Sequence, residues 1–381
     1  MRARRIFPAL AAAVAALLPA ALVGQGAPVG STTGFTGVEV RGLSFQSGLG
    51  IKKVTQIAVP FAAVWQAGSR LSFDLGGRYA TVSRTDESGA STSLSGVTDI
   101  QVRGMYQLAR DVAVLTVSVN LPTGKTKLTP DQLPVAGIIA SDMLPFAVTN
   151  FGSGFNVTSG LALAVPVGGW ALGVAGSYRA NGSDTPVADT GPAGASYKAG
   201  GEFRVRIGAD RIVGQSRVSV GVTYSSYGDD TFGNSPLFQS GKRFIPQASW
   251  TFPVGNMGLT LYAWDMYRGA GSVLINGTNT EKRNVLTVGA AASVQTGRSV
   301  LRPQIEFRNY TSGLCLGAVS SSLCAAGKLV SLGARYQLAV SERVAFVPLV
   351  RLETGNLVNQ STGQAVTFTG WDVGITLRAA M

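Results

Sequence analysis

Apolar and polar residues alternate with a period of two along most of the chain, beginning near residue 35. Phe203, Val205 and Ile207, for example, share one face of their segment, whereas Arg204 and Arg206 share the opposite face. The same alternation recurs in later segments and continues to the final residue. Because a period of two is the spacing of half-buried β-strands, the pattern predicts an all-β protein.

Short and long connections alternate between the expected strands. The longer links are polar, at 84–93, 178–196 and 227–241, and the short ones are tight turns at 65–70, 107–112, 166–170, 209–217, 253–258, 295–300 and 339–344. Transmembrane barrels combine short turns at one end with longer loops at the other. The sequence therefore predicts a transmembrane antiparallel up-and-down β-barrel of about sixteen strands, with fourteen or twelve as alternatives.

Tryptophan and tyrosine residues lie toward opposite ends of the expected strands. Trp65, Trp170 and Trp250 lie beside short turns, and the tyrosines nearer the long loops are Tyr79, Tyr178, Tyr197, Tyr224, Tyr227, Tyr267 and Tyr310. Tryptophan and tyrosine are enriched at both interfaces of a membrane. This distribution favours a membrane barrel over a soluble sandwich, barrel or propeller.

The first residues have the layout of a secretory signal peptide. Three arginines within the first five residues precede an apolar run at 6–23, and small and polar residues follow it. A membrane-anchoring helix is the alternative, but prolines interrupt the run and no charged stop follows it. We therefore expect a signal peptide at 1–26, a barrel at 27–381, and export to the outer membrane of a Gram-negative-type bacterium.

The absence of histidine changes the range of functions. Without it the chain lacks the commonest general base and the commonest metal ligand, so we expect neither an enzyme nor a cofactor. Gly-Lys-Thr at 124–126 looks like part of a phosphate-binding loop, but Val119 stands where that loop needs glycine.

The formal charge is +12, or about +9 without the leader, which favours binding of anions or anionic lipid heads. Because the basic residues are dispersed, we expect no nucleic-acid partner.

The chain has two cysteines, Cys315 and Cys324, nine residues apart. Their spacing matches no Cys-x-x-Cys motif, and export would expose them to an oxidising compartment. We expect a local disulfide, with two free thiols as the alternative.

Two stretches carry a resemblance to a known family. They are VSVNLPTGK at 117–125 and FGSGFNVTSGLALAVPVGGWALGVAGSYRANG at 151–182. Over the about 65 residues from the start of the first stretch to the end of the second, the chain resembles the outer-membrane β-barrel family associated with phenol-degradation meta-pathways. The resemblance implies a porin-like transporter that passes small, often hydrophobic or aromatic compounds, and it implies no catalytic residues.

One face of each strand in such a barrel meets lipid and the other meets the lumen. Assigning the polar face inward gives a lumen in which bases outnumber acids. The expected pore-lining bases are Arg78, Arg103, Lys198, Arg204, Arg206, Arg217, Arg302, Arg308, Arg335, Arg351 and Arg378, together with Arg41 and Arg179. The opposing acids are Glu39, Asp74, Asp99, Glu202, Glu306, Glu353 and Asp372, with Arg78 near Asp74 and Arg103 near Asp99. Most of these groups are expected to pair across strands, and the surplus would favour anions.

The longest connection, at 122–153, is too apolar at 133–146 for a freely solvated loop. One hypothesis is that it folds into the lumen against a smooth patch of small inward residues at 160–164, 171–177 and 289–293. The alternatives are that it caps the outside or contacts a neighbouring barrel.

Two functions follow from this reading. The leading one is an outer-membrane channel for passive passage of small solutes, either anions or small hydrophobic or aromatic compounds. The alternative is a structural or adhesive barrel with a blocked lumen. The expected partners are the lipid bilayer and lipopolysaccharide, the barrel-assembly machinery, small-molecule solutes and, by analogy with trimeric porins, two further copies in a homotrimer.

Overall fold

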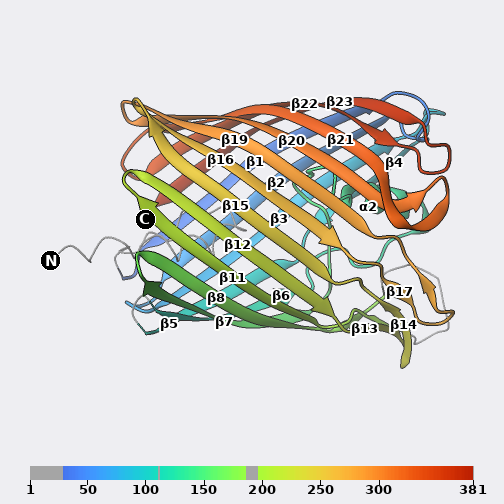
Figure 1. The fold of residues 1–381 in the computed structure, drawn as a ribbon, viewed down its shortest axis with the longest axis horizontal. Coiled ribbons are helices and arrows are strands. Elements are labelled where there is room, and N and C mark those ends of the chain that lie inside the picture. Colours follow the sequence, from blue (N-terminus) through green and yellow to red (C-terminus); the bar gives the residue numbers. More distant parts are fainter. Residues whose placement is uncertain (1–28, 110–111, 186–195, 381) are drawn as a thin grey trace.

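A computed structural model describes residues 29–109, 112–185 and 196–380, and the expected signal peptide lies outside them. One antiparallel sheet forms the wall of a closed barrel (Figure 1). Its strands are β1 (Thr32–Phe45), β2 (Lys53–Gln66), β3 (Leu71–Thr85), β4 (Ser91–Val97), β5 (Ile100–Ala109), β6 (Ala113–Leu121), β7 (Asn156–Val167), β8 (Trp170–Asn181), β11 (Glu202–Val213), β12 (Ser216–Tyr227), β15 (Arg243–Val254), β16 (Met257–Arg268), β19 (Arg283–Thr296), β20 (Ser299–Cys315), β21 (Ala318–Ala339), β22 (Val344–Val358) and β23 (Ala365–Ala380). Within the described residues no helix is both long and apolar enough to cross a membrane.

The wall has sixteen positions, as the sequence predicted. β4 and β5 both pair with β3 and together form one interrupted strand of the wall. The first strand, β1, pairs with the last, β23, along almost its whole length, which closes the barrel. Among the residues that the structure describes, closure leaves no strand edge of the wall unpaired, so the backbone polar groups of the strands bond to neighbouring strands instead of water.

The two ends of the barrel differ. Tight turns join neighbouring strands at the end where β1 begins and β23 finishes, here called the hairpin end. The opposite end, the loop end, carries the long connections. Three of these form a second sheet, of β9 (Ser183–Asp184), β10 (Tyr197–Lys198), β13 (Asp229–Phe232), β14 (Ser235–Gln239), β17 (Ser272–Val273) and β18 (Thr278–Asn279).

The second sheet corrects one sequence-based expectation. Lys198 was expected to line the lumen together with Arg204, yet the chain leaves the wall at Gly200 and Gly201. A side chain at Gly200 would collide with the backbone of Gly228, and one at Gly201 would meet the Tyr178 hydroxyl at 2.5 Å. Only glycine permits this close approach, so the wall strand β11 begins at Glu202 and Lys198 lies outside the wall.

Side chains alternate across the wall as predicted. On β7, Leu161, Leu163 and Val165 are exposed on the outer face, and Leu352 of β22 is 60% exposed there. Such a continuous apolar outer surface is typical of a barrel surrounded by lipid. The arginines described below lie on the inner face.

The hydrophobic core of the molecule lies inside the barrel. The connection between β6 and β7 folds inward and contains a 3-10 helix, η3 (Pro130–Gln132), and a short helix, α2 (Leu133–Ile139), which Figure 1 shows within the barrel outline. Its buried residues include Val135, Ile139, Met143, Leu144, Phe146 and Val148. They pack against inward residues of the wall, chiefly Leu43, Val54, Val82, Leu94, Leu329 and Phe368.

Candidate functional site: the inserted loop and the arginine wall

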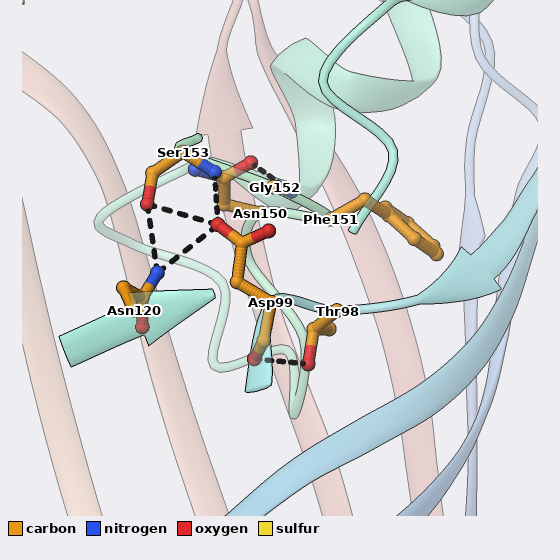
Figure 2. Close-up of a pocket in the computed structure, with 7 residues that line it drawn as sticks. All are labelled: Thr98, Asp99, Asn120, Asn150, Phe151, Gly152 and Ser153. Carbon is orange, nitrogen blue, oxygen red and sulfur yellow. Dashed lines mark hydrogen bonds between the residues drawn. The ribbon is translucent and has the colours of Figure 1, made fainter. Parts of the chain in front are cut away.

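Both ends of the inserted loop, residues 122–155, form hydrogen bonds to one carboxylate, that of Asp99. Asp99 lies in the two-residue break between β4 and β5, and Figure 2 shows the groups that surround it. Its Oδ1 accepts the amide of Gly124 at 3.0 Å, and its Oδ2 accepts the amide of Ser153 at 2.6 Å. Asn120 Nδ2 also donates to Oδ2, at 3.0 Å. One side chain thus holds both ends of the loop.

The Pro-Thr-Gly sequence at 122–124 has a structural role at this base. Thr123 Oγ1 accepts the Ile100 amide at 2.9 Å and donates to the Thr98 carbonyl at 3.1 Å, which bridges the break in the wall. A side chain at Gly124 would collide with the Phe151 carbonyl and approach the Asp99 amide at 2.7 Å. Close approach of the backbone therefore requires glycine at 124. The two stretches that carry the family resemblance meet here.

Polar contacts attach the loop to β1, β2 and β3. Gln56 Nε2 donates to the Val148 carbonyl at 2.8 Å, and the Val148 amide donates to Gln56 Oε1 at 3.0 Å. Arg41 donates to the Pro145 carbonyl and Arg78 to the Ala147 carbonyl. These bonds satisfy carbonyl and amide groups that the loop has buried away from water.

Arg41 also belongs to a buried cluster of charged side chains where β1 pairs with β23 and closes the barrel. Its guanidinium is 1% exposed, bonds Glu353 of β22 and lies 3.8 Å from Asp372 of β23. Arg351 Nη1 lies 3.8 Å from Glu353. The cluster connects the first strand, the last two strands and the loop.

The loop also reaches the opposite wall. Arg308 of β20 donates to the Met143 carbonyl at 3.3 Å, and Arg268 of β16 lies 3.6 Å from Asp142. The expectation that the loop packs on the small-residue patch is nevertheless wrong. Its apolar residues pack on β1–β4, β21 and β23 because those strands point larger apolar side chains inward.

Most predicted pore-lining arginines of the wall have acidic partners. Arg204 pairs with Glu202 at 2.7 Å, Arg217 with Asp210 at 2.9 Å, and Arg308 with Glu306 at 2.8 Å. Arg179 pairs more loosely with Glu202, at 3.7 Å. No ion pair in the described part of the chain involves Arg206, Arg302, Arg335 or Arg378.

Two expected pairings are corrected. Asp74 pairs with Arg103 at 2.7 Å, since these residues lie directly opposite on β3 and β5. Arg78 therefore does not pair with Asp74 but holds the loop. Asp99 does not pair with Arg103, because the loop amides occupy its oxygens.

Lys198 lies on β10 of the second sheet, exposed to solvent, and therefore does not line the barrel wall. The sequence analysis also missed inner-face residues. Arg243, Arg268 and Arg283 stand at strand ends beside long loops, where alternation is hardest to follow. The sequence pattern that could have identified them is a basic residue at the loop end of each of three successive wall strands.

Two carboxylates at the loop end have shifted pKa values of opposite sign. The backbone amides of Gly48, Gly50 and Leu49 donate to Glu87 and lower its pKa. Burial, followed by repulsion from Asp99, raises the pKa of Asp184. Asp184 thus adds unfavourable charge beside the base of the inserted loop.

Cys315 and Cys324 form a disulfide, with their Cα atoms 5.8 Å apart. The expected local disulfide is present, and the segment around it is a continuation of β20 and β21. The bond therefore links two antiparallel strands at the loop end.

No family model and no curated protein matches the chain. Among solved structures, the CymD monoaromatic hydrocarbon channel is 13% identical, with a TM-score of 0.42 over 94% of this chain and 90% of that chain. The anion-selective porin from Comamonas acidovorans is 13% identical, with a TM-score of 0.40 over 92% of this chain and 100% of that one. Salmonella typhi OmpF in complex with daunomycin is 15% identical, with a TM-score of 0.44 over 92% and 98%. These similarities concern barrel architecture, at identities too low to carry a function.

Proposed function

We propose that the chain forms an outer-membrane channel for passive passage of small solutes. The observation that supports this most is a closed sixteen-position barrel with an apolar outer face and arginines on its inner face. Barrels of about sixteen strands are wide enough to leave an aqueous channel, whereas those of about eight are filled by side chains. The inserted loop narrows that interior from the side of β1–β4.

We further propose that the channel prefers anions. Arg206, Arg302, Arg335 and Arg378 bring positive charge to the inner face without an ion-pair partner among the described residues. Rings and rows of arginine are how pores select anions. Passage of small aromatic compounds, which the family resemblance implies, remains the alternative solute class.

Conductance of the refolded mature chain in a planar bilayer tests the proposal, with a salt gradient to read selectivity. We expect discrete current steps and a reversal potential of the sign that anion preference gives. A folded barrel that is silent at every voltage would contradict the channel, and cation preference would contradict the selectivity.

A structural or adhesive barrel with a blocked lumen is the second candidate. It is favoured by the loop's attachment to both walls, through Gln56 and Arg78 on one side and Arg268 and Arg308 on the other. A silent barrel that conducts after replacement of 133–146 by a short Gly-Ser linker would identify this loop as the block.

The remaining assignments extend this proposal. The apolar outer face would contact the bilayer and lipopolysaccharide, after insertion by the barrel-assembly machinery, and three copies would form a homotrimer. The chain would be exported by the 1–26 signal peptide. With no histidine in the sequence, we expect no hydrolase activity.

A further inference from the structure

A row of three arginines crosses the lumen wall at its loop end. Arg243 of β15 lies directly opposite Arg268 of β16, and Arg268 lies directly opposite Arg283 of β19. Directly opposed residues of antiparallel strands point to the same face, here the inner one. Like charges in that arrangement are destabilising, so the row requires negative charge nearby.

The chain's own acids supply only part of that charge. Arg283 bonds Glu281, two residues before it, and Arg268 faces Asp142. Arg243 has no ion pair within the described ranges, and its Nε atom is buried without a hydrogen-bond partner. One guanidinium of the row therefore has no carboxylate.

Asp142 is attached loosely to the row. Its Oδ2 lies 3.6 Å from Arg268 Nη2, beyond hydrogen-bond range, and that oxygen is buried with no hydrogen-bond partner. By contrast, Arg217 and Asp210 in the same wall meet at 2.9 Å. The loop places the Asp142 carboxylate beside the row, held by the neighbouring Met143 carbonyl on Arg308.

Two tyrosines lie near the row, and a third aromatic residue lies four strand positions further along the wall. Tyr310 lies within electrostatic reach of Arg283 and Asp142, and Tyr227 within reach of Arg268. Arg308 lies over the ring of Trp264, 5.7 Å from its centroid. The row thus has tyrosine side chains close to its guanidinium groups.

We propose that Arg243, Arg268 and Arg283 form a binding site for a small carboxylate solute, in which Asp142 is a tethered competitor. Guanidinium groups bind carboxylates through two parallel N–H donors, a geometry that Asp142 does not achieve. An entering carboxylate pairs with Arg243 and displaces Asp142 from Arg268. This deepens the proposed channel function by naming the class of anion and its first site.

Equilibrium binding of benzoate to the detergent-folded barrel, measured by calorimetry, tests the site. Removing the competitor with Asp142→Asn should tighten binding about tenfold, and Arg243→Gln should weaken it about tenfold, since each alters a charge-assisted contact. Acetate should compete with benzoate. Arg211→Gln removes an equal charge beside Trp170 at the hairpin end and should change binding less than about twofold.

Three results would overturn the site: no change with Asp142→Asn, an equal loss with Arg211→Gln, or failure of acetate to compete. Because binding in detergent does not require an open pore, the two proposals fail separately. Benzoate binding by a barrel that is silent in bilayers rejects the channel alone. Conductance without benzoate binding rejects the site alone.

Discussion

The two halves of the barrel interior differ in how they use inward side chains. The wall of β1–β4, β21 and β23 presents Leu43, Val54 and Val82, and the inserted loop covers them to make a core. The wall of β7–β19 presents glycine and alanine beside a row of arginines. One half is packed like the interior of a soluble protein, whereas the other is lined by small residues and the row of three arginines. In the proposed channel, the loop-filled half would contribute packing and the other half would leave room for solute.

The largest expected effect concerns a charge in the packed half. Arg41→Ala would leave Glu353 and Asp372 buried without their shared cation, and we expect the free energy of unfolding to fall by about 3–5 kcal/mol. Denaturant unfolding of the refolded barrel in detergent measures it. Arg206→Ala, on β11 of the other half, is the control and should change stability by about 0.5 kcal/mol or less. Equal losses at both positions would remove the distinction between the two halves.

A smaller effect is expected at the base of the loop. Gly124→Ala places a methyl group against the Phe151 carbonyl and Asp99, which we expect to cost about 1–3 kcal/mol and to loosen the loop. Gly137→Ala in α2 is the matched control, because a Cβ there meets nothing within 4 Å and alanine favours a helix. Proteolysis within 122–155 should increase for the first variant only. If both variants resist cleavage equally, the hydrogen bonds of Asp99 to the two ends of the loop do not hold it in place.

The smallest effect depends on pH. The raised pKa of Asp184 means that the folded protein holds this proton more tightly, so its contribution to stability is lost as pH rises above 3.8 through the folded value. Asp184→Asn should therefore stabilise the barrel at neutral pH and make no difference in acid.

Glu87 is expected to affect stability with the opposite dependence on pH. Because its pKa is lowered, its contribution is present at neutral pH and is lost as pH falls below 4.5. Glu87→Gln should destabilise the 46–52 segment at neutral pH, as read by hydrogen exchange, and not in acid. Parallel rather than opposite pH profiles for the two variants would show that the loop-end carboxylates respond only to net charge.

The sequence predicted most of the fold because the strands and turns of a β-barrel follow from patterns among residues that are close together in the chain. Alternation with a period of two assigned the faces of β7, β11 and β23, and the alternation of short and long links gave the sixteen wall positions. The apolar character of 133–146 indicated that this connection would be buried. Each of these signals depends on neighbours along the chain.

The site depended on contacts that no local pattern contains. The pairing of Asp74 with Arg103, the use of Asp99 for both ends of the loop, and the meeting of Asp142 with Arg268 join residues 25 or more positions apart. Pairing register and loop path decide which of several inward charges become neighbours, and the departure of the chain from the wall at Gly200 and Gly201 places Lys198 outside it. The sequence by itself therefore determined the barrel and the chemistry available inside it. The tertiary structure decided which half is filled and which arginines remain beside a loosely held carboxylate, because a loop folded inside a closed wall selects its partners by shape.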